Sequence, residues 1–325
     1  MDNPYAIDPV LVEVVRNGFV ESVHHGRVAV TNPDGSLAAS LGSEFAPIYP
    51  RSASKPLQAV GMVRAGLDLP PELLALVCAS HSGEPFQLDG IRRILAGAGL
   101  DESALQTPPD WPFDEVERER AIRAGGQKSA LSMNCSGKHA GMLSTAVHLG
   151  ADVATYLDPD HPVQLAIAST IDDLASEQAA NLAMDGCGAP LYTLSTYGLA
   201  RSFGRLAAAT DGPEARVAAA VREHPENVSG TRRDELELHR AIPGLIAKAG
   251  AESVYAVGLP DGRGVAVKIS DGGMRARAVA MAGVLLQLGF DHETLHAQAS
   301  APVLGHGRRV GEVRPAARTL SQLGV

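Results

Sequence analysis

The chain has 325 residues, of which 45% are hydrophobic and 20% are charged. This composition is typical of globular proteins and excludes a disordered or collagen-like chain. With 28 basic and 37 acidic residues the formal net charge is −9, and an acidic chain without a Lys/Arg block is a poor binder of nucleic acid and of anionic membranes.

No segment of the sequence predicts export or membrane insertion. The N-terminal stretch Met1–Val10 contains two aspartates and lacks the apolar run of a secretory signal. The longest apolar runs, such as Ala278–Leu288, are too short to span a bilayer. The three cysteines are too few for a disulfide framework. We therefore expect a cytoplasmic protein that does not associate with a membrane.

The first part of the chain predicts an antiparallel hairpin or meander. Strands are expected at Leu11–Arg16, Arg27–Thr31 and Ser36–Leu41. The sequence Asn-Pro-Asp-Gly at Asn32–Gly35 is typical of a tight turn between the last two strands.

The middle of the chain predicts helices, because apolar residues recur there with helical spacing. Leu73–Cys78 is predicted to be a buried helix or strand. The segment Thr107–Glu115, with three Pro and one Trp, is predicted to be a surface loop. The predicted helices are Pro56–Ala65, Pro85–Gly99, Lys138–Leu149, Val163–Leu174, Arg201–Ala209, Glu214–Glu223 and Asp234–Lys248.

Strands return near the C-terminus, at Ser253–Val257 and Gly264–Ile269, followed by a helix at Arg275–Leu288. Strands at both ends with helices between them predict an α+β fold, in which one antiparallel sheet is built from N- and C-terminal strands beside a helical region. A parallel α/β sheet is the competing architecture. We expect one domain over residues 1–325.

The first candidate site is Ser52 with Lys55, three residues apart at a predicted helix start. At this spacing the hydroxyl and the amine share one helix face. A neutral lysine can take the serine proton and generate a nucleophile. An ordinary helix cap followed by a solvated lysine is the commoner origin of so short a pattern.

A second candidate is Ser80, in the small polar turn that follows the apolar run ending at Cys78. Such turns often carry site residues, although a capped helix end with a buried cysteine is the commoner explanation. A third candidate is Lys268, which interrupts a strand whose other face carries Val265, Val267 and Ile269. That lysine either lines a cleft or is simply solvated.

Two further segments each place a cysteine beside glycine. They are Asn134-Cys135-Ser136-Gly137-Lys138-His139 and Asp185-Gly186-Cys187-Gly188. Cys135, Lys138 and His139 could reach one metal ion, and Cys187 is the obvious further ligand because a single cysteine cannot form a two-cysteine zinc site. Structural small-residue turns are the alternative.

Some familiar catalytic patterns do not occur. The sequence contains no phosphate-binding loop and no Gly-x-Ser-x-Gly elbow. A Ser-x-x-Lys followed far downstream by a strand lysine resembles serine β-lactamases and penicillin-binding proteins, although Lys268 is followed by Ile-Ser and not by Thr-Gly.

Five motifs in order resemble the asparaginase II family, the Rhizobium etli-type L-asparaginases, over nearly the whole chain. They are Arg51-Ser52-Ala53-Ser54-Lys55-Pro56, Cys78-Ala79-Ser80-His81-Ser82, Asn134-Cys135-Ser136-Gly137-Lys138-His139, Asp185-Gly186-Cys187 and Val267-Lys268-Ile269-Ser270-Asp271-Gly272. The resemblance implies a serine β-lactamase-like fold and the hydrolysis of L-asparagine to L-aspartate and ammonia.

The resemblance also implies two Ser–Lys pairs, Ser52 with Lys55 and Ser80 with Lys268, of which we favour Ser52 as the acylated serine. It implies a zinc ion on Cys135, Lys138 and Cys187, completed by water, with Asp185 beside these ligands. A lysine ligand must be deprotonated, so we expect occupancy to depend on pH. Residues expected to contact the substrate are Arg51, Asn134, His139 and Asp185.

We expect a homodimer that acts on a small molecule. Within the hydrolases, a glutaminase or a β-lactam or D-peptide hydrolase is the alternative, and the missing secretory signal argues against the latter. A zinc-dependent amino-acid-binding protein without catalysis is the non-enzymatic alternative, in which the Ser–Lys pairs would form a buried hydrogen-bond network.

Overall fold

The structure is a computed structural model that describes residues 8–324. The N-terminal stretch for which the sequence predicts no secretory signal lies mostly outside these residues. The chain forms two compact units. The first comprises Met1–Ala53, Leu194–Ala208 and Glu237–Val325, and the second comprises Ser54–Thr193 and Ala209–Leu236. That both act as one domain stays a prediction.

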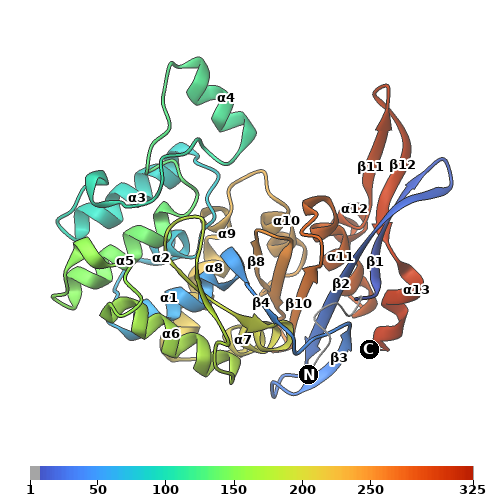
Figure 1. Ribbon diagram of the computed structural model, residues 1–325, viewed down its shortest axis with the longest axis horizontal. Coiled ribbons are helices and arrows are strands. Elements are labelled where there is room, and N and C mark those ends of the chain that lie inside the picture. The colour runs from blue at the N-terminus through green and yellow to red at the C-terminus, as the bar shows by residue number, and fades with distance from the viewer. Residues whose placement is uncertain (1–7, 325) are drawn as a thin grey trace. The chain divides into compact units, whose positions relative to one another are not determined.

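The first unit contains an eight-stranded sheet in the order β11-β12-β1-β2-β10-β9-β8, with β3 paired to β2 (Figure 1). Each of these strand pairs is antiparallel. The predicted α+β fold, with a sheet built from both ends of the chain, is therefore confirmed. The strands are β1 (Val10–Arg16), β2 (Phe19–Thr31), β3 (Leu37–Leu41), β8 (Ile246–Gly250), β9 (Val254–Gly258), β10 (Gly264–Ile269), β11 (Ala301–Gly305) and β12 (Arg308–Pro315).

One predicted strand is only the end of a longer one. The segment Arg27–Thr31 belongs to β2, which begins at Phe19 directly after a hairpin turn. Asn17 and Gly18 have φ angles of 47° and 80° in this turn, and an Asn-Gly pair with two left-handed residues matches the right-handed twist of the strands it joins. The Asn17-Gly18 pair is thus the sequence signal for a hairpin that begins β2 earlier than predicted.

The helix predicted at Asp234–Lys248 is wrong. Helix α10 (Asp234–Ala241) ends early, and strand β8 follows it. Pro243 cannot continue a helix, and Gly244, with φ of 87°, turns the chain. All five residues of β8, Lys248 included, are buried, and a short strand buried on both faces cannot be distinguished from a helix segment by its periodicity.

The two faces of the sheet differ in residue size. Val265, Val267 and Ile269 join a core that includes residues of α11 (Met274–Gln287). On the opposite face a methyl group at Gly264 would lie 1.8 Å from the carbonyl oxygen of Ala200 in α7 (Thr196–Ala208). Strand alternation places Lys268 on this second face. The first unit also contains β4 (Pro47–Ile48) paired with β7 (Leu194–Ser195), α12 (Glu293–Gln298) and α13 (Ala317–Leu320).

The second unit is helical apart from one hairpin. Leu73–Cys78 lies almost entirely in a helix, α2, and the hairpin and α4 were not predicted. No helix within residues 8–324 is long and apolar enough to cross a membrane. The elements are α1 (Lys55–Arg64), α2 (Pro71–Val77), α3 (Pro85–Gly97), α4 (Glu115–Arg123), α5 (Ser136–His148), α6 (Pro162–Ala175), α8 (Gly212–Glu223), α9 (Pro225–Val228), β5 (Leu182–Met184) and β6 (Pro190–Tyr192).

Small residues allow the helices of the second unit to approach one another closely. A methyl group at Gly61 of α1 would lie 2.9 Å from the Cα atom of Ile167 in α6. Residues of α1 from Lys55 to Met62 are all buried. A lysine at the start of this helix is thus enclosed by the unit, and its amine must find partners there.

Candidate functional site

Ser52 lies in a short 3-10 turn, Arg51–Ser54, that continues without a break into α1 at Lys55. Pro56 occupies one of the first positions of the helix, where its missing N–H leaves no hydrogen bond unmade. The boundary between the two units falls between residues 53 and 54 of this turn. The predicted helix start at the Ser-x-x-Lys motif is therefore present.

Within the first unit, the backbone of Ser52 lies against the end of β8. A methyl group at Gly250 would lie 2.7 Å from the carbonyl oxygen of Pro50 and 3.3 Å from the amide nitrogen of Ser52. Gly250 pairs with Val254, which pairs with Lys268. Since adjacent strands lie about 4.8 Å apart, Gly250 and Lys268 are about 10 Å apart. This unit brings Ser52 and Lys268 to the same end of its sheet.

Lys268 is held at the strand end by carbonyl groups. Its Nζ donates to the carbonyl oxygen of Glu252 at 2.8 Å and to that of Ile269. The Glu252 carboxylate also lies 3.9 Å from the guanidinium of Arg51. Burial, assisted by Arg27 across the β2–β10 pair, lowers the pKa of Lys268 from its usual value despite nearby acids. A neutral amine is thus more accessible here than on a solvated lysine.

Three residues around this end of the sheet have left-handed backbones. Arg51, Glu252 and Ser253 have φ angles of 52°, 56° and 53°. Residues other than glycine adopt this region rarely, and such conformations cluster at active sites, where surrounding structure imposes them. The two strained segments are joined by the Arg51–Glu252 ion pair.

In the second unit, Lys55 is 1% exposed and contacts the Ser80 segment. Its Nζ donates to the carbonyl oxygen of Ala79 at 2.6 Å and to Oγ of Ser80 at 3.0 Å. This Lys55–Ser80 contact was not predicted from the sequence. The predicted partner of Ser80, Lys268, lies in the other unit. That pairing, and the pairing of Ser52 with Lys55, stay predictions.

The segment Ser80–Glu84, called the Ser80 turn below, has every backbone N–H engaged. The first donates to the carbonyl oxygen of Val228 at 3.0 Å and the second to that of Asn134 at 3.0 Å. The last three converge on Oε1 of Gln87 at 2.9 to 3.3 Å. None of these five groups is available to stabilise an oxyanion without first giving up its present partner.

Cys135, Lys138 and Cys187, called the cysteine cluster below, meet in the second unit. Cys135 caps the N-terminus of α5, Lys138 lies in its first turn, and Cys187 lies in the turn of the β5–β6 hairpin. All three are buried, and Lys138 Nζ donates to Cys187 Sγ at 3.1 Å. The structure thus brings together the three predicted metal ligands.

Contacts among Cys135, Lys138 and Cys187 determine which of these side chains carry a charge. A hydrogen bond with Cys135, helped by the charge of Lys138, lowers the pKa of Cys187 well below its usual value against the effect of burial. The same hydrogen bond, together with burial, raises the pKa of Cys135. Burial would lower the pKa of Lys138, but Cys187, Cys135 and Asp185 outweigh it and raise that pKa. The cluster therefore holds a thiolate beside an ammonium group.

The donors of the cysteine cluster suit zinc in kind. Within residues 8–324, no group of three or more His, Cys, Asp or Glu side chains could hold a metal ion. Two sulfur donors and one amine nitrogen nevertheless make three ligands of the types zinc accepts, with a fourth position left for water. Because Cys135 and Lys138 carry protons here, binding would release them.

The residues predicted to contact substrate have other partners in the structure. His139 is fully buried, with Nδ1 2.7 Å from the hydroxyl of Tyr156. The Oδ1 atom of Asn134 lies 3.1 Å from the sulfur of Cys135. Asp185 accepts from the amide of Gly186 in the hairpin turn, and Arg51 lies in the first unit beside Glu252.

Sequence reasoning missed several residues that position the site. Glu252 and Gly250 lie between a helix wrongly predicted and a strand, so no pattern marked them. Gln87 did have a signal, because Glu84 and Gln87 form a capping box with Pro85 at the helix start. Its side chain closes the Ser80 turn by accepting three backbone hydrogen bonds.

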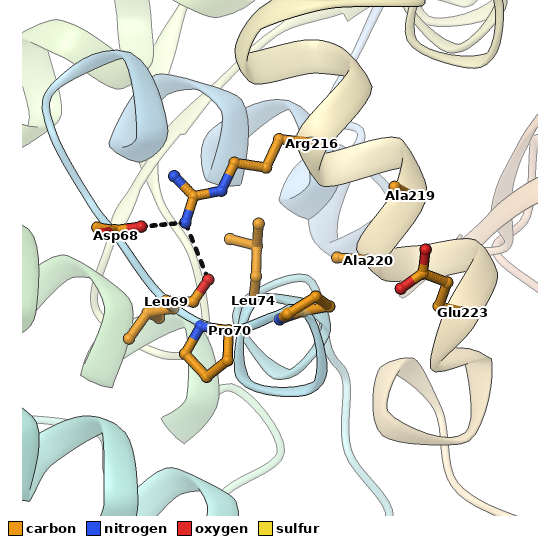
Figure 2. A pocket seen from close by; sticks show the side chains of 9 residues that line it. Asp68, Leu69, Pro70, Leu74, Arg216, Ala219, Ala220 and Glu223 are labelled. Atoms are coloured by element: carbon orange, nitrogen blue, oxygen red, sulfur yellow. Dashed lines mark hydrogen bonds and ion pairs between the residues drawn. The ribbon is translucent and has the colours of Figure 1, made fainter.

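A surface pocket lies elsewhere in the second unit. The pocket has a volume of about 420 Å³ and is lined by residues from the segment before α2, from α2 and from α8. Figure 2 shows its lining side chains. Arg216 donates to the carbonyl oxygen of Leu69 at 2.9 Å and to the carboxylate of Asp68. Its lining includes none of the predicted site residues.

Comparison with known proteins gives one family match. The sequence model of the family described as L-asparaginase II matches residues 12–315. No curated protein matches the chain significantly in sequence. Among solved structures, the chain is similar to Mglu in its native form, with 16% identity, coverage of 94% of this chain and 78% of that one, and a TM-score of 0.43.

Two further solved structures are described as beta-lactamases. One, from Mycobacterium bovis, shares 15% identity over 76% of this chain and 87% of that one, with a TM-score of 0.33. The other, from Bacteroides dorei, shares 14% identity over 79% and 92% of the respective chains, with a TM-score of 0.39.

Proposed function

The chain belongs to the L-asparaginase II family and is thus an amidohydrolase, and on that premise we propose that it hydrolyses the side-chain amide of L-asparagine through an acyl-enzyme. The observation that carries this proposal is the buried amine of Lys55, three residues from Ser52 and 3.0 Å from Oγ of Ser80. We assign this amine to moving protons to and from the nucleophile, as a neutral lysine beside a serine can do.

Ser52 is the serine we assign to the acyl-enzyme. The backbone N–H of Ser80 donates to Val228, so it is not available to an oxyanion formed on that residue, whereas acyl transfer requires such donors around the developing charge. Ser52 lies in the turn that runs directly into α1, the position of a nucleophile that heads a helix in Ser-x-x-Lys enzymes. This local geometry favours Ser52.

The proposed reaction has two halves. The Ser52 hydroxyl oxygen attacks the amide carbon, its proton passes to neutral Lys55, and that proton is returned to the leaving nitrogen as ammonia departs. Water then attacks the resulting aspartyl ester, and the same groups move protons in reverse. We assign Ser80 and Lys268 to relaying these protons, which agrees with the lowered pKa of Lys268.

We propose that zinc, when present, is held by the cysteine cluster. A bound zinc ion would supply a positive charge for the substrate's polar groups. Cys135 and Cys187 would bind it as thiolates and Lys138 as a neutral amine, and Asp185 would offset the charge from the hairpin turn. The homodimeric state and the cytoplasmic location stay predictions.

The test is ammonia release from L-asparagine and from L-glutamine by the purified chain. We expect asparagine to be preferred. A pocket distinguishes substrates that differ by one methylene by about 1–3 kcal/mol, or roughly 10- to 200-fold in kcat/KM. Turnover of glutamine alone would keep the amidohydrolase assignment and reject the substrate, whereas release from neither would reject the proposed function.

The matched variants are Ser52→Ala and Ser54→Ala. Ser52→Ala should lower kcat by about four orders of magnitude, since the nucleophile and its base act as one unit. Ser54 lies in the same turn, but its Oγ accepts from Gln58 at 2.9 Å. The kcat of Ser54→Ala should therefore stay within about threefold of the parent value, because loss of this hydrogen bond affects the stability of the fold more than the chemistry. Equal activity of the two variants would remove Ser52 from the mechanism.

A further inference from the structure

Two hydrogen bonds join the Ser80 turn to the segment that carries Cys135. The amide of His81 donates to the carbonyl oxygen of Asn134 at 3.0 Å, and Nε2 of His81 lies 2.8 Å from Oγ of Ser136. Both side chains are fully buried. The contact thus links residues directly next to Ser80 with residues directly next to Cys135.

The direction of the side-chain bond follows from its surroundings. Ser136 Oγ donates its proton to the carbonyl oxygen of Leu131 at 2.7 Å, so it must accept from the histidine, and Nε2 carries the hydrogen. Burial, with the charge of Lys55, lowers the pKa of His81 to about 3. His81 is therefore a neutral, fixed donor and not a proton-transfer group at neutral pH.

His81 and Ser136 each lie next to a residue of the candidate site: His81 follows Ser80, and Ser136 follows Cys135. Ser80, next to His81, accepts from Lys55. Ser136 and Gly137 begin α5, and a methyl group at Gly137 would lie 2.3 Å from the carbonyl oxygen of Leu76, near the end of α2. The start of α5 and the end of α2 therefore lie in direct contact. A shift at one is transmitted to the other, because close-packed interiors do not deform freely.

We propose that His81 and Ser136 are positioning residues that couple metal loading of the cysteine cluster to the placement of Ser80. The inference rests on the proposed function for the role of Ser80 and for zinc. The coupling itself is carried by the hydrogen bonds of this pair. Filling the cluster fixes the first turn of α5, the Ser136 hydroxyl fixes the His81 ring, and the ring fixes the Ser80 turn.

The variants compare two buried hydroxyls of the same helix. Ser136→Ala removes the acceptor of the His81 hydrogen bond. Thr145→Ala is the matched control, since Thr145 is fully buried in α5 and its Oγ1 donates to the carbonyl oxygen of Gly141 at 2.7 Å. Ser136→Ala loses two buried hydrogen bonds, with Leu131 and with His81, and Thr145→Ala loses one, but only Ser136→Ala breaks the connection to His81. His81→Gln, whose amide N–H can replace the ring donor, should retain part of the coupling.

The experiment measures amide hydrogen exchange of the metal-free full chain with and without added zinc chloride. In the parent and in Thr145→Ala, zinc should slow exchange in peptides covering residues 133–140 and 185–189, and also in the Ser80 turn by about tenfold, a typical coupling between sites. In Ser136→Ala the first two peptides should still be protected, while protection of the Ser80 turn should fall to about twofold or less.

Three results would overturn the inference. They are protection of the cysteine cluster without protection of the Ser80 turn in the parent, equal protection of that turn in Ser136→Ala, and no zinc-dependent protection at all. The readout does not require turnover, so an inactive parent with intact coupling would reject the proposed function alone. If asparagine is hydrolysed, Ser136→Ala should lower kcat of the zinc-loaded enzyme about tenfold with KM nearly unchanged, whereas Thr145→Ala should alter neither more than about twofold.

Discussion

Lys138 and Cys187 show how a single contact determines the state of a site. Their side chains come from segments 49 residues apart and meet at 3.1 Å. A thiolate and an ammonium group compensate each other's charge in a buried setting, where either alone would be strongly disfavoured. The metal-free cluster is therefore a stable arrangement in its own right, and zinc must compete with protons for it.

Replacement of Cys187 by Ser should abolish zinc binding, because the cluster then keeps one sulfur donor. We expect up to about one zinc per chain in the parent, measured by plasma mass spectrometry after dialysis. Cys78→Ser is the control, since Cys78 is buried and forms no disulfide but lies outside the cluster. Occupancy should rise with pH, because Lys138 must lose its proton to bind. Equal zinc content in the two variants would discard the site.

Single site residues could be predicted where they belong to a sequence motif, but the contacts between their side chains could not. The five motifs identified Ser52, Lys55, Ser80 and the cysteine cluster. No linear pattern indicated that the amine of Lys55 reaches Ser80, because this contact depends on how the end of α2 packs beside α1. Glu252 escaped for the same reason: its role comes from a turn that brings it next to Lys268.

At the scale of elements, the β2–β10 pair places Arg27 directly opposite Lys268. Arg27 also forms an ion pair with Asp8, its Nε donating to the carboxylate at 3.1 Å. A second cation beside Lys268 disfavours the protonated amine and so lowers its pKa, whereas Asp8 opposes this effect. The strand register thus tunes a candidate proton carrier.

Replacing Arg27 with Gln should move the rising limb of the kcat/KM profile to higher pH. The lysine works as the neutral amine, so activity rises as pH passes its pKa. Removing the cation and leaving Asp8 unpaired both raise that pKa, and we expect a shift of about 0.5 to 1 unit. Arg16→Gln, which removes an exposed ion pair with Glu21, should leave the limb in place. A limb that stays fixed in Arg27→Gln would exclude Lys268 as the titrating group.

Elements were predictable from periodicity as long as one face was polar. The alternation of β10 placed Val265, Val267 and Ile269 in the core, as observed. The strand β8 is buried on both faces, so its sequence lacks alternation, and the helix predicted before it extended to Lys248. The sequence Pro243-Gly244 was the available signal that the helix ends before β8.

For the whole molecule, the sheet built from both ends of the chain was predictable, because strand patterns occur at both ends and helical patterns between them. The sequence also predicted a sheet part and a helical part, but not where the chain divides between two compact units. Their boundary falls inside the turn from Arg51 to Ser54, where the sequence shows no linker, glycine run or change in composition.

Acid should destabilise the fold through His81. Its pKa is lowered to about 3 in the folded chain by burial and by Lys55, against about 6.5 in an unfolded one. The unfolded state therefore binds a proton first, and stability that is fully present above pH 6.5 is lost as pH falls toward 3. From pH 7 to pH 4 the loss from this residue is about 3 kcal/mol.

Urea unfolding at the two pH values measures this effect. The free energy of unfolding of the parent should fall more steeply with acid than that of His81→Gln, by about 3 kcal/mol over the interval, since glutamine does not titrate. Parallel curves for the two proteins would show that the fold does not lower the pKa of His81, and that His81 is not held as the neutral donor described above.

The most direct test of the account is to find which serine carries the acyl group. The parent enzyme is mixed with L-asparagine, quenched with acid during turnover, digested and mapped by mass spectrometry. The account predicts an aspartyl ester on the peptide that contains Ser52, with none in Ser52→Ala and a retained ester in Ser80→Ala. An ester on the Ser80 peptide, or ammonia release without any ester, would contradict it.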